Sequence, residues 1–224
     1  MGIACDKCGC HSKAQVNEYQ DKIIWWCNAC QHFLVEEKKY DEALKKAMYV
    51  FWEKGYEGTT MADLIESICM KAPSIYAAFG NKDAIFKEVV QSYLPIVVDG
   101  QLKVLNSSQK ICDAVQATLN ACVNLYTGKD NPPSCLVMTA AINTAPEHEE
   151  HIGALRVLRE KYKDAWQKRF EQAKLDKQLD DDANPSELAE YFTTLIQGMT
   201  IKAKDGASKD SLDATVKLAM QVLK

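Results

Sequence analysis

Residues 43–94 read ALKKAMYVFWEKGYEGTTMADLIESICMKAPSIYAAFGNKDAIFKEVVQSYL, a pattern of several short amphipathic helices in succession. The first helix has one apolar face, because its apolar residues recur at intervals of three and four. Those residues are Leu44, Ala47, Met48 and Phe51. Gly55 ends this helix, since glycine is favoured just past a helix C-terminus.

Three further helices are indicated in the same stretch. Thr60 with Asp63 three residues later has the pattern of a capping box, which begins a second short helix. A break near residues 69–72 separates it from a third helix, whose first turn accommodates Pro73. A fourth helix follows and reaches Pro95, a residue that kinks or ends a helix.

This stretch resembles the DNA-binding domain of TetR-family transcription regulators. The resemblance rests on Phe51, Gly55-Tyr56, Thr59-Thr60, Ala62-Asp63-Leu64, Ser74-Ile75-Tyr76, Phe79 and the run from Asn81 to Phe86. It implies a helix-turn-helix near residues 59–79, with the third helix in the major groove. The groove-facing residues would be Lys71, Ala72, Ser74, Tyr76 and Ala77. The phosphate contacts that the resemblance implies are Thr60, Tyr76 and Lys82.

Two positions depart from the family pattern. Cys69 occupies a turn position that is commonly glycine, and Ala72 stands where basic residues are common. Residues 41–94 also carry six lysines against eight acidic residues, so counterion release from this unit alone is modest. Either lysines of the N-terminal segment supply further DNA contacts, or the unit binds protein in place of DNA. We favour DNA binding.

Residues 1–37 contain two cysteine pairs, Cys5-x-x-Cys8 and Cys27-x-x-Cys30, separated by 18 residues. Each pair directs two sulfurs at one centre, and two pairs complete a tetrahedron around a metal ion. The residues between them have the aromatic and β-branched content of a hairpin. The sequence therefore predicts a small β-rich zinc ribbon whose structural zinc supplies much of its folding free energy.

Other uses of these cysteines are an iron site of the rubredoxin type, a redox dithiol, or thiols without metal. Zinc is favoured over iron because nothing in the sequence indicates electron transfer. Cys10, His11 and His32 are near enough to be alternative ligands, but four thiolates already complete the set. Four protein ligands leave no open coordination position, so catalysis by the metal is not expected.

From residue 95 onward the chain reads as a series of longer helices. Resemblance to the same family is weaker here, and it implies a domain that binds a small-molecule effector and forms a homodimer. The last two helices, at about 185–204 and 208–223, would pair with those of a partner in a four-helix bundle.

Three cysteines of this half, Cys112, Cys122 and Cys135, lie on apolar helices, where buried structural thiols are the ordinary case. Cys135 stands at an expected helix N-terminus, which stabilises a thiolate, so it is the first candidate for a redox or electrophile sensor. His148 and His151 have the spacing of a two-histidine metal site. We favour a solvated first turn of a helix, because the neighbouring acids complement the helix dipole.

The composition is that of an ordinary globular protein, with 224 residues, 47% hydrophobic, 26% charged and a net charge of −4. No apolar run approaches the roughly 20 residues needed to span a bilayer. The first residues lack the apolar core of a signal peptide, so a cytoplasmic location without a membrane partner is expected. The sequence has no nucleophile–base motif or phosphate-binding glycine loop, so neither enzyme activity nor catalytic residues are expected.

The expected fold class is all-α: a TetR-like helix-turn-helix domain at 38–94 and an effector-binding and dimerisation bundle at 95–224, preceded by the zinc ribbon at 1–37. The expected function is that of a homodimeric repressor, which binds a double-stranded DNA operator and responds to a small-molecule effector. The alternative is a zinc-ribbon protein-interaction module on a TetR-like scaffold that has lost or weakened DNA binding.

Overall fold

The computed structural model describes residues 37–142 and 144–223. The expected zinc ribbon, with Cys5, Cys8, Cys27 and Cys30, lies outside the described residues. Every regular element in the described ranges is helical, in agreement with the all-α expectation for this part of the chain. None of the described helices is long and apolar enough to cross a membrane.

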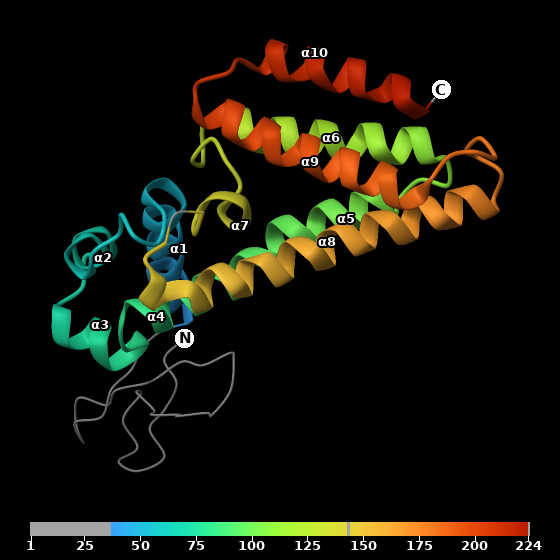
Figure 1. Ribbon diagram of the computed structural model, residues 1–224. Helices are drawn as coiled ribbons and strands as arrows, with labels where there is room; N and C mark the ends of the chain where they lie inside the picture. Colours follow the sequence, from blue (N-terminus) through green and yellow to red (C-terminus); the bar gives the residue numbers. More distant parts are fainter. Residues whose placement is uncertain (1–36, 143, 224) are drawn as a thin grey trace, which may run out of the picture.

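The N-terminal part of the described chain is a unit of four helices (Figure 1). They are α1 (Glu37–Lys54), α2 (Met61–Ile68), α3 (Ala72–Phe79) and α4 (Lys82–Tyr93). Helix α1 packs against both α2 and α4. The small core between them contains five buried side chains: Phe51, Leu64, Ile68, Ile75 and Phe79.

The α-helical pattern of α4 ends at Tyr93, two residues before Pro95. The chain continues through a π-helical segment, η1 (Leu94–Val98), directly into α5 (Asp99–Leu105). The N–H of Asp99 donates to the carbonyl of Leu94, five residues earlier. Proline removes a hydrogen bond of the α-helical pattern, and a wider turn is one way to continue past it. The expected end of the fourth helix near Pro95 is thus confirmed for the α-helical pattern, which gives way to a π-helical turn.

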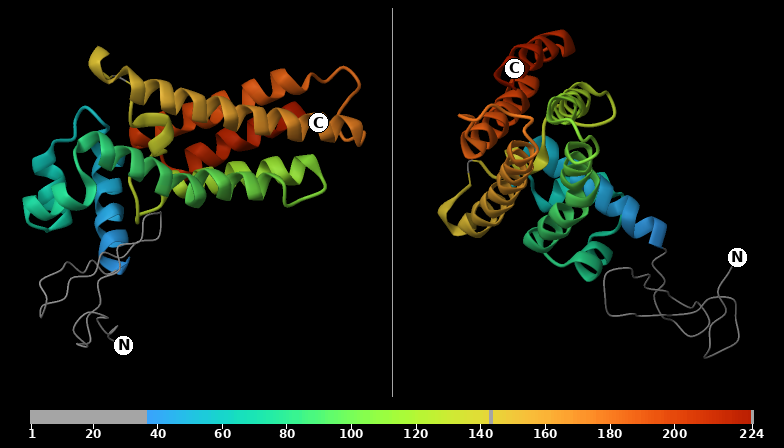
Figure 2. Two further views of the ribbon diagram at one scale, coloured as in Figure 1. Left: turned by 90° about the horizontal axis from the view of Figure 1, so that it is seen from below. Right: turned by 90° about the vertical axis from the view of Figure 1, so that its right-hand side faces the viewer.

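The remaining helices form a bundle beside this unit (Figures 1 and 2). They are α6 (Ile111–Thr127), α7 (Leu136–Thr139), the 3-10 turn η2 (Pro146–His148), α8 (Glu149–Leu175), α9 (Pro185–Lys204), α10 (Lys209–Ala219) and the 3-10 turn η3 (Met220–Leu223). Helix α8 packs along α9, and α6 packs against α5, α9 and α10. Helix α9 has the expected bounds, whereas α10 begins one residue later than expected and ends at Ala219, with η3 completing the expected range to 223.

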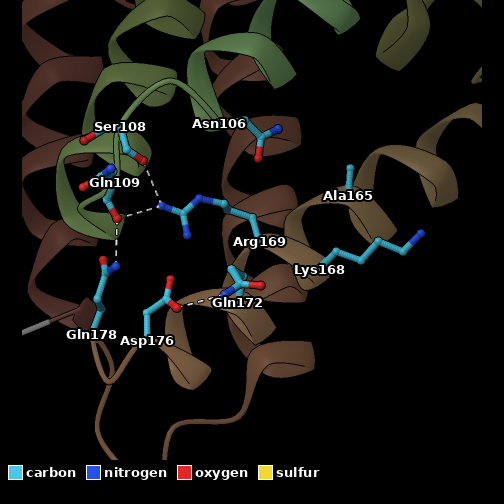
Figure 3. A pocket seen from close by; sticks show the side chains of 9 residues that line it. All are labelled: Asn106, Ser108, Gln109, Ala165, Lys168, Arg169, Gln172, Asp176 and Gln178. Atoms are coloured by element: carbon cyan, nitrogen blue, oxygen red, sulfur yellow. Dashed lines mark hydrogen bonds between the residues drawn. The ribbon is translucent and has the colours of Figure 1, made fainter.

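The end of α8 that is remote from the DNA-binding unit is joined to the α5–α6 loop by Arg169 (Figure 3). Its Nη2 donates to the carbonyl oxygens of Ser108 and Gln109, at 3.1 and 3.3 Å. Gln178 adds a hydrogen bond of 2.8 Å to the same Gln109 carbonyl. The polar side chains around this surface depression thus satisfy main-chain groups of the loop.

Candidate nucleic-acid interface

Helix α2 begins at a complete capping box. The Thr60 hydroxyl accepts a hydrogen bond from the Asp63 N–H at 3.1 Å, and the Thr60 N–H donates to Asp63 Oδ2 at 2.8 Å. Lys54 Nζ lies 2.6 Å from the other carboxylate oxygen of Asp63. The hydrogen bond from Lys54, followed by those from Thr60, holds the pKa of Asp63 well below its usual value. These contacts fix the start of α2 and its angle to α1.

The turn between α2 and α3 uses a left-handed residue that is not glycine. Cys69 has φ 60° and ψ 37°, and its N–H donates to the carbonyl of Ile65. A side chain in this region is strained because its Cβ crowds the backbone. The departure from the family pattern at Cys69 therefore carries an energetic cost, while the turn itself keeps the geometry that glycine normally provides.

Helix α3 presents one face to the core and another to solvent. Ile75 and Phe79 are buried, whereas Tyr76 is 50% exposed. Lys71 and Ala77 are exposed, and Ala72 and Ser74 are half-buried. Lys71 is the N-cap residue of α3, and its side chain accepts no hydrogen bond from the first N–H groups of the helix. The residues expected to read DNA thus lie at the N-terminal end and outer face of α3.

Lys82, an expected phosphate contact, lies at the first turn of α4. The side chain of Asn81 caps this helix by accepting from the Ala84 N–H at 2.9 Å. The Lys82 ammonium lies 4.1 Å from the centroid of the Tyr56 ring, in a cation–π contact. Lys82 is half-buried in this contact. Its role in DNA binding stays a prediction.

Four acidic side chains of this unit contact partners within the protein. Asp63 pairs with Lys54, and Glu88 accepts a hydrogen bond from Tyr40. Glu57 and Asp83 contact the first turn of α8. Four of the eight acidic side chains in residues 41–94 therefore have a partner within the protein, and Asp63 is the one of these four whose partner is a lysine.

The first turn of α8 binds α4 through His151. His151 Nε2 lies 2.8 Å from Asp83 Oδ1, and its ring centroid lies 4.2 Å from that of Tyr56. The Tyr56 hydroxyl donates to the same carboxylate. The pKa of Asp83 is lowered, first by the hydrogen bond from Tyr56 and then by that from His151. This cluster connects the DNA-binding unit to the bundle.

A second histidine makes a parallel contact. His148 Nδ1 lies 2.8 Å from Glu57 Oε1, and the Ala145 N–H donates to the same oxygen at 2.8 Å. The solvated-turn interpretation of these histidines was wrong, because His151 is only 4% exposed and both imidazoles have carboxylate partners. The described residues include no group of three metal-ligating side chains that could hold a metal ion, at these histidines or elsewhere.

Helix α7 and its flanking residues also contact the DNA-binding unit. The Tyr56 N–H donates to the Ala140 carbonyl at 2.6 Å, and Trp52 Nε1 donates to the Ser134 carbonyl at 2.9 Å. Gly55 has φ 73°, and a Cβ there would lie 3.2 Å from the Ala140 oxygen. Glycine is thus required at this position both by its backbone conformation and by the close approach of α7.

The candidate sensor Cys135 is the N-cap residue of α7 and is 3% exposed. Burial raises the pKa of its thiol. The expected thiolate at a helix N-terminus is therefore not the resting form, because desolvation outweighs the stabilisation by the helix. Tyr93 Oη lies 3.4 Å from Cys135 Sγ, and Cys122 is also buried, with its pKa raised to about 12. A sensing role for Cys135 stays a prediction.

Comparison with known proteins identifies the family. Residues 43–89 match the family model described as bacterial regulatory proteins, tetR family. The HTH-type transcriptional repressor ComR of Escherichia coli (strain K12) is 30% identical over 173 residues, which are 77% of this chain and 82% of ComR. The HTH-type transcriptional regulator YezE of Bacillus subtilis (strain 168) is 28% identical over 189 residues, which are 83% of this chain and 97% of YezE.

A solved structure shows the same fold at similar identity. The TetR-family regulator CifR, as a cysteine mutant complexed with 26-bp operator DNA, is 34% identical to this chain. The match covers 81% of this chain and 95% of CifR, with a TM-score of 0.78. With the helix-turn-helix geometry of α2 and α3, these matches establish that the chain belongs to the TetR family of bacterial regulatory proteins and is a DNA-binding transcriptional regulator.

Proposed function

We propose that this protein is a homodimeric, ligand-responsive repressor that acts in the cytoplasm. The observation that carries the proposal is the arrangement of α3, whose outer face is exposed while Ile75 and Phe79 anchor its inner face. ComR is a repressor, and CifR is complexed with operator DNA. These relatives are regulators, and they favour DNA binding over the alternative of a protein-interaction module.

Within this function we assign base reading to α3 and phosphate contacts to its surroundings. Lys71, Ala72, Ser74 and Tyr76 would meet base edges or flanking backbone in the major groove. Thr60, Tyr76 and Lys82 would contact phosphates, with the N–H groups at helix N-termini assisting. The exposure of Tyr76 supports this assignment. The side chain is 50% exposed, so much of its apolar area is left unburied in the monomer.

We assign the dimer contact to α9 and α10. Large apolar side chains on these helices are exposed in the single chain: Tyr191, Ile201 and Leu218, at 41%, 43% and 66%. A second copy would cover them in a four-helix bundle. The two α3 helices of a dimer must lie about 34–36 Å apart to enter successive major grooves. Each protomer would then bind one half-site of the operator.

We place the response to effector in the contacts between the bundle and the DNA-binding unit. These are the hydrogen bonds of Trp52 and Tyr56 to the α7 segment and the histidine–carboxylate pairs at α8. A ligand that binds more tightly to one arrangement of the bundle favours that arrangement. The contacts then change, and with them the spacing of the two α3 helices in the dimer. If Cys135 is a sensor, α7 must first move, because the thiol is buried.

We also propose that Cys5, Cys8, Cys27 and Cys30 hold one structural zinc ion. Support comes from the sequence alone, as two C-x-x-C pairs provide four thiolates with the spacing of a zinc ribbon. Elemental analysis of purified protein tests this proposal. About one zinc per chain is expected, iron in its place would indicate a rubredoxin-like site, and less than about half an equivalent of either metal refutes it.

The function is tested on DNA taken from upstream of the protein's own gene. We expect a mobility shift at low salt and a footprint over a two-fold symmetric site. A matched variant with Lys71→Ala and Tyr76→Ala should keep its fold, since both side chains are exposed, and should lose the shift. Failure of the native protein to shift any upstream fragment would contradict the proposal. Protein capture that survives high salt without DNA binding would support the interaction-module alternative.

A further inference from the structure

A surface depression lies between the remote end of α8 and the α5–α6 loop (Figure 3). Its volume of about 720 Å³ is within the roughly 300–1,000 Å³ that small-molecule sites occupy. Every side chain that lines it is polar or charged, with the exception of Ala165. A ligand in this depression would therefore be recognised mainly by hydrogen bonds and charge.

Arg169 is the one charged side chain of this depression that is buried, at 9% exposure. Its guanidinium has five N–H donors. Nε donates to the Leu105 carbonyl at 3.4 Å, and Nη2 donates to the carbonyls of Ser108 and Gln109 at 3.1 and 3.3 Å. Nη1 makes no hydrogen bond with any described residue, and it is not one of the fully enclosed atoms. Figure 3 shows this third nitrogen directed toward the side of the depression that Asp176 lines.

The positive charge of Arg169 has no carboxylate partner among the described residues. Its acceptors there are all main-chain carbonyls, which carry no net charge. Asp176 lines the same depression, but its carboxylate accepts a hydrogen bond from the Gln172 amide at 2.9 Å. Burying a charged side chain is costly unless an opposite charge compensates it. An anion in the depression would supply the counterion that the described side chains do not.

The charges around Arg169 favour a ligand group with a single negative charge. Lys168 and Asp176 are exposed at the rim of the depression. With Arg169 they make two cations against one carboxylate, so the lining residues have a formal charge of +1. A carboxylate group neutralises this charge, whereas a doubly charged group leaves an excess negative charge beside Asp176. Hydrogen bonds from a guanidinium to a carboxylate are also stronger than those to a neutral acceptor.

We infer that this depression binds a small molecule through a single carboxylate group, which accepts a hydrogen bond from Arg169 Nη1. Lys168 adds a weaker attraction from the rim, because its ammonium group is exposed to solvent. Asp176 opposes the bound charge and so disfavours groups with more than one negative charge. The inference goes beyond the proposed function and does not depend on it, because no residue of the DNA-binding unit lines the depression.

The test is an NMR titration of the ¹⁵N-labelled full-length protein, with chloride used to keep the ionic strength constant. The Arg169 Nε–H signal reports on the guanidinium directly, and the main-chain amide signals of residues 106–109 report on the loop. Acetate carries a single charge, acetamide has the same shape without charge, and sulfate is doubly charged. We expect acetate to half-saturate the shift at a concentration about fivefold lower than either of the others. An equal response to acetamide, a preference for sulfate, or no saturable shift with acetate would overturn the inference.

Two rim variants locate the site, and both should keep the fold because the side chains are exposed. Lys168→Ala should weaken acetate binding about two- to fivefold, the range of one exposed ion pair. Asp176→Asn should strengthen it by a similar factor, since it removes a like charge. Lys45→Ala is the matched control, because this exposed lysine of α1 does not line the depression, and it should bind as the native protein does. Effects of the same sign at Lys168 and Asp176, or an equal effect at Lys45, would overturn the assignment.

Arg169→Gln tests the buried cation itself and should abolish the response to acetate in the amide signals of residues 106–109. Native acetate affinity in this variant would overturn the inference. Because the substitution also removes hydrogen bonds to the loop, its fold is checked by urea denaturation. If Arg169→Gln does not fold, the opposite effects expected for Lys168→Ala and Asp176→Asn decide the question. No DNA is present in these titrations, so a failure of operator binding would count against the proposed repressor function alone.

Discussion

His151 Nε2 on α8 and Asp83 Oδ1 on α4 are separated by 2.8 Å, although the residues are 68 positions apart in the chain. Tyr56 donates to the same carboxylate, and its ring lies against the imidazole at an interplanar angle of 47°. The DNA-binding unit is therefore bound to the bundle by a polar contact that is largely shielded from solvent on the histidine side. Such a contact makes the stability of the domain junction depend on pH.

The first prediction concerns that dependence. The pKa of Asp83 is lowered in the folded protein, so the carboxylate contributes stability above its unfolded value, near 3.8, and this contribution is lost as pH falls through the folded pKa. Asp83→Asn should lower the melting temperature at neutral pH. The difference in melting temperature from the native protein should begin to shrink below about pH 4 and vanish below the folded pKa of Asp83. In a His151→Gln background the effect of Asp83→Asn should shrink. A pH-independent difference would contradict this account.

Thr60→Ala should lower the free energy of unfolding by about 1 kcal/mol, because it removes the N-cap of α2. Urea denaturation measures the loss. Thr60→Ser keeps the hydroxyl that accepts from the Asp63 N–H, so it should retain most of the stability. A similar loss in both variants would show that the methyl group of threonine, and not the cap, is responsible.

Cys69→Gly should raise the free energy of unfolding by about 0.5–1 kcal/mol, since glycine adopts positive φ without strain. Cys69→Ala is the control, because it keeps a Cβ at φ 60° and should bring no such gain. Thermal unfolding of both variants against the native protein distinguishes relief of backbone strain from removal of the thiol.

Lys71→Ala should weaken operator binding and reduce the slope of log affinity against log salt by about 1, as expected for one lost phosphate contact. If Lys71 contacts a base instead, the loss should be confined to particular operator sequences. Lys168→Ala is the matched control, since this exposed lysine lies on the remote half of α8 (Figure 3). An equal effect of both substitutions would indicate a general charge effect.

The cysteines of the described part should differ in reactivity. Cys69 is exposed and should react with N-ethylmaleimide in the native protein, whereas Cys122 and Cys135 are buried with raised pKa and should react only on unfolding. Peptide mapping by mass spectrometry measures each site. Labelling of Cys135 as fast as Cys69 would show that α7 opens readily, and would favour the sensor prediction.

The elements of the helix-turn-helix could be predicted because their signals are local. The capping box at Thr60 and Asp63 and the apolar spacing of α1 depend on residues within a few positions of one another. Cys69 was singled out differently, through the family resemblance, because glycine is common at its turn position.

The junction between the two halves could not be predicted in this way. His148 and His151 find their partners 91 and 68 residues away, so no local pattern identifies Glu57 and Asp83 as acceptors. A histidine pair at i and i+3 in an acidic helix start was the only signal, and it does not distinguish solvent from protein as the partner.

The length of α8 has a mechanical consequence. Its 27 residues form one unbroken helix, anchored by His151 near one end and by Arg169 toward the other. A helix of this size is about 40 Å long, so pivoting it by about 5° displaces its far tip by about 3.5 Å. A rearrangement too small to break the packing of the bundle would thus be magnified at the domain junction, with α8 acting as a lever arm.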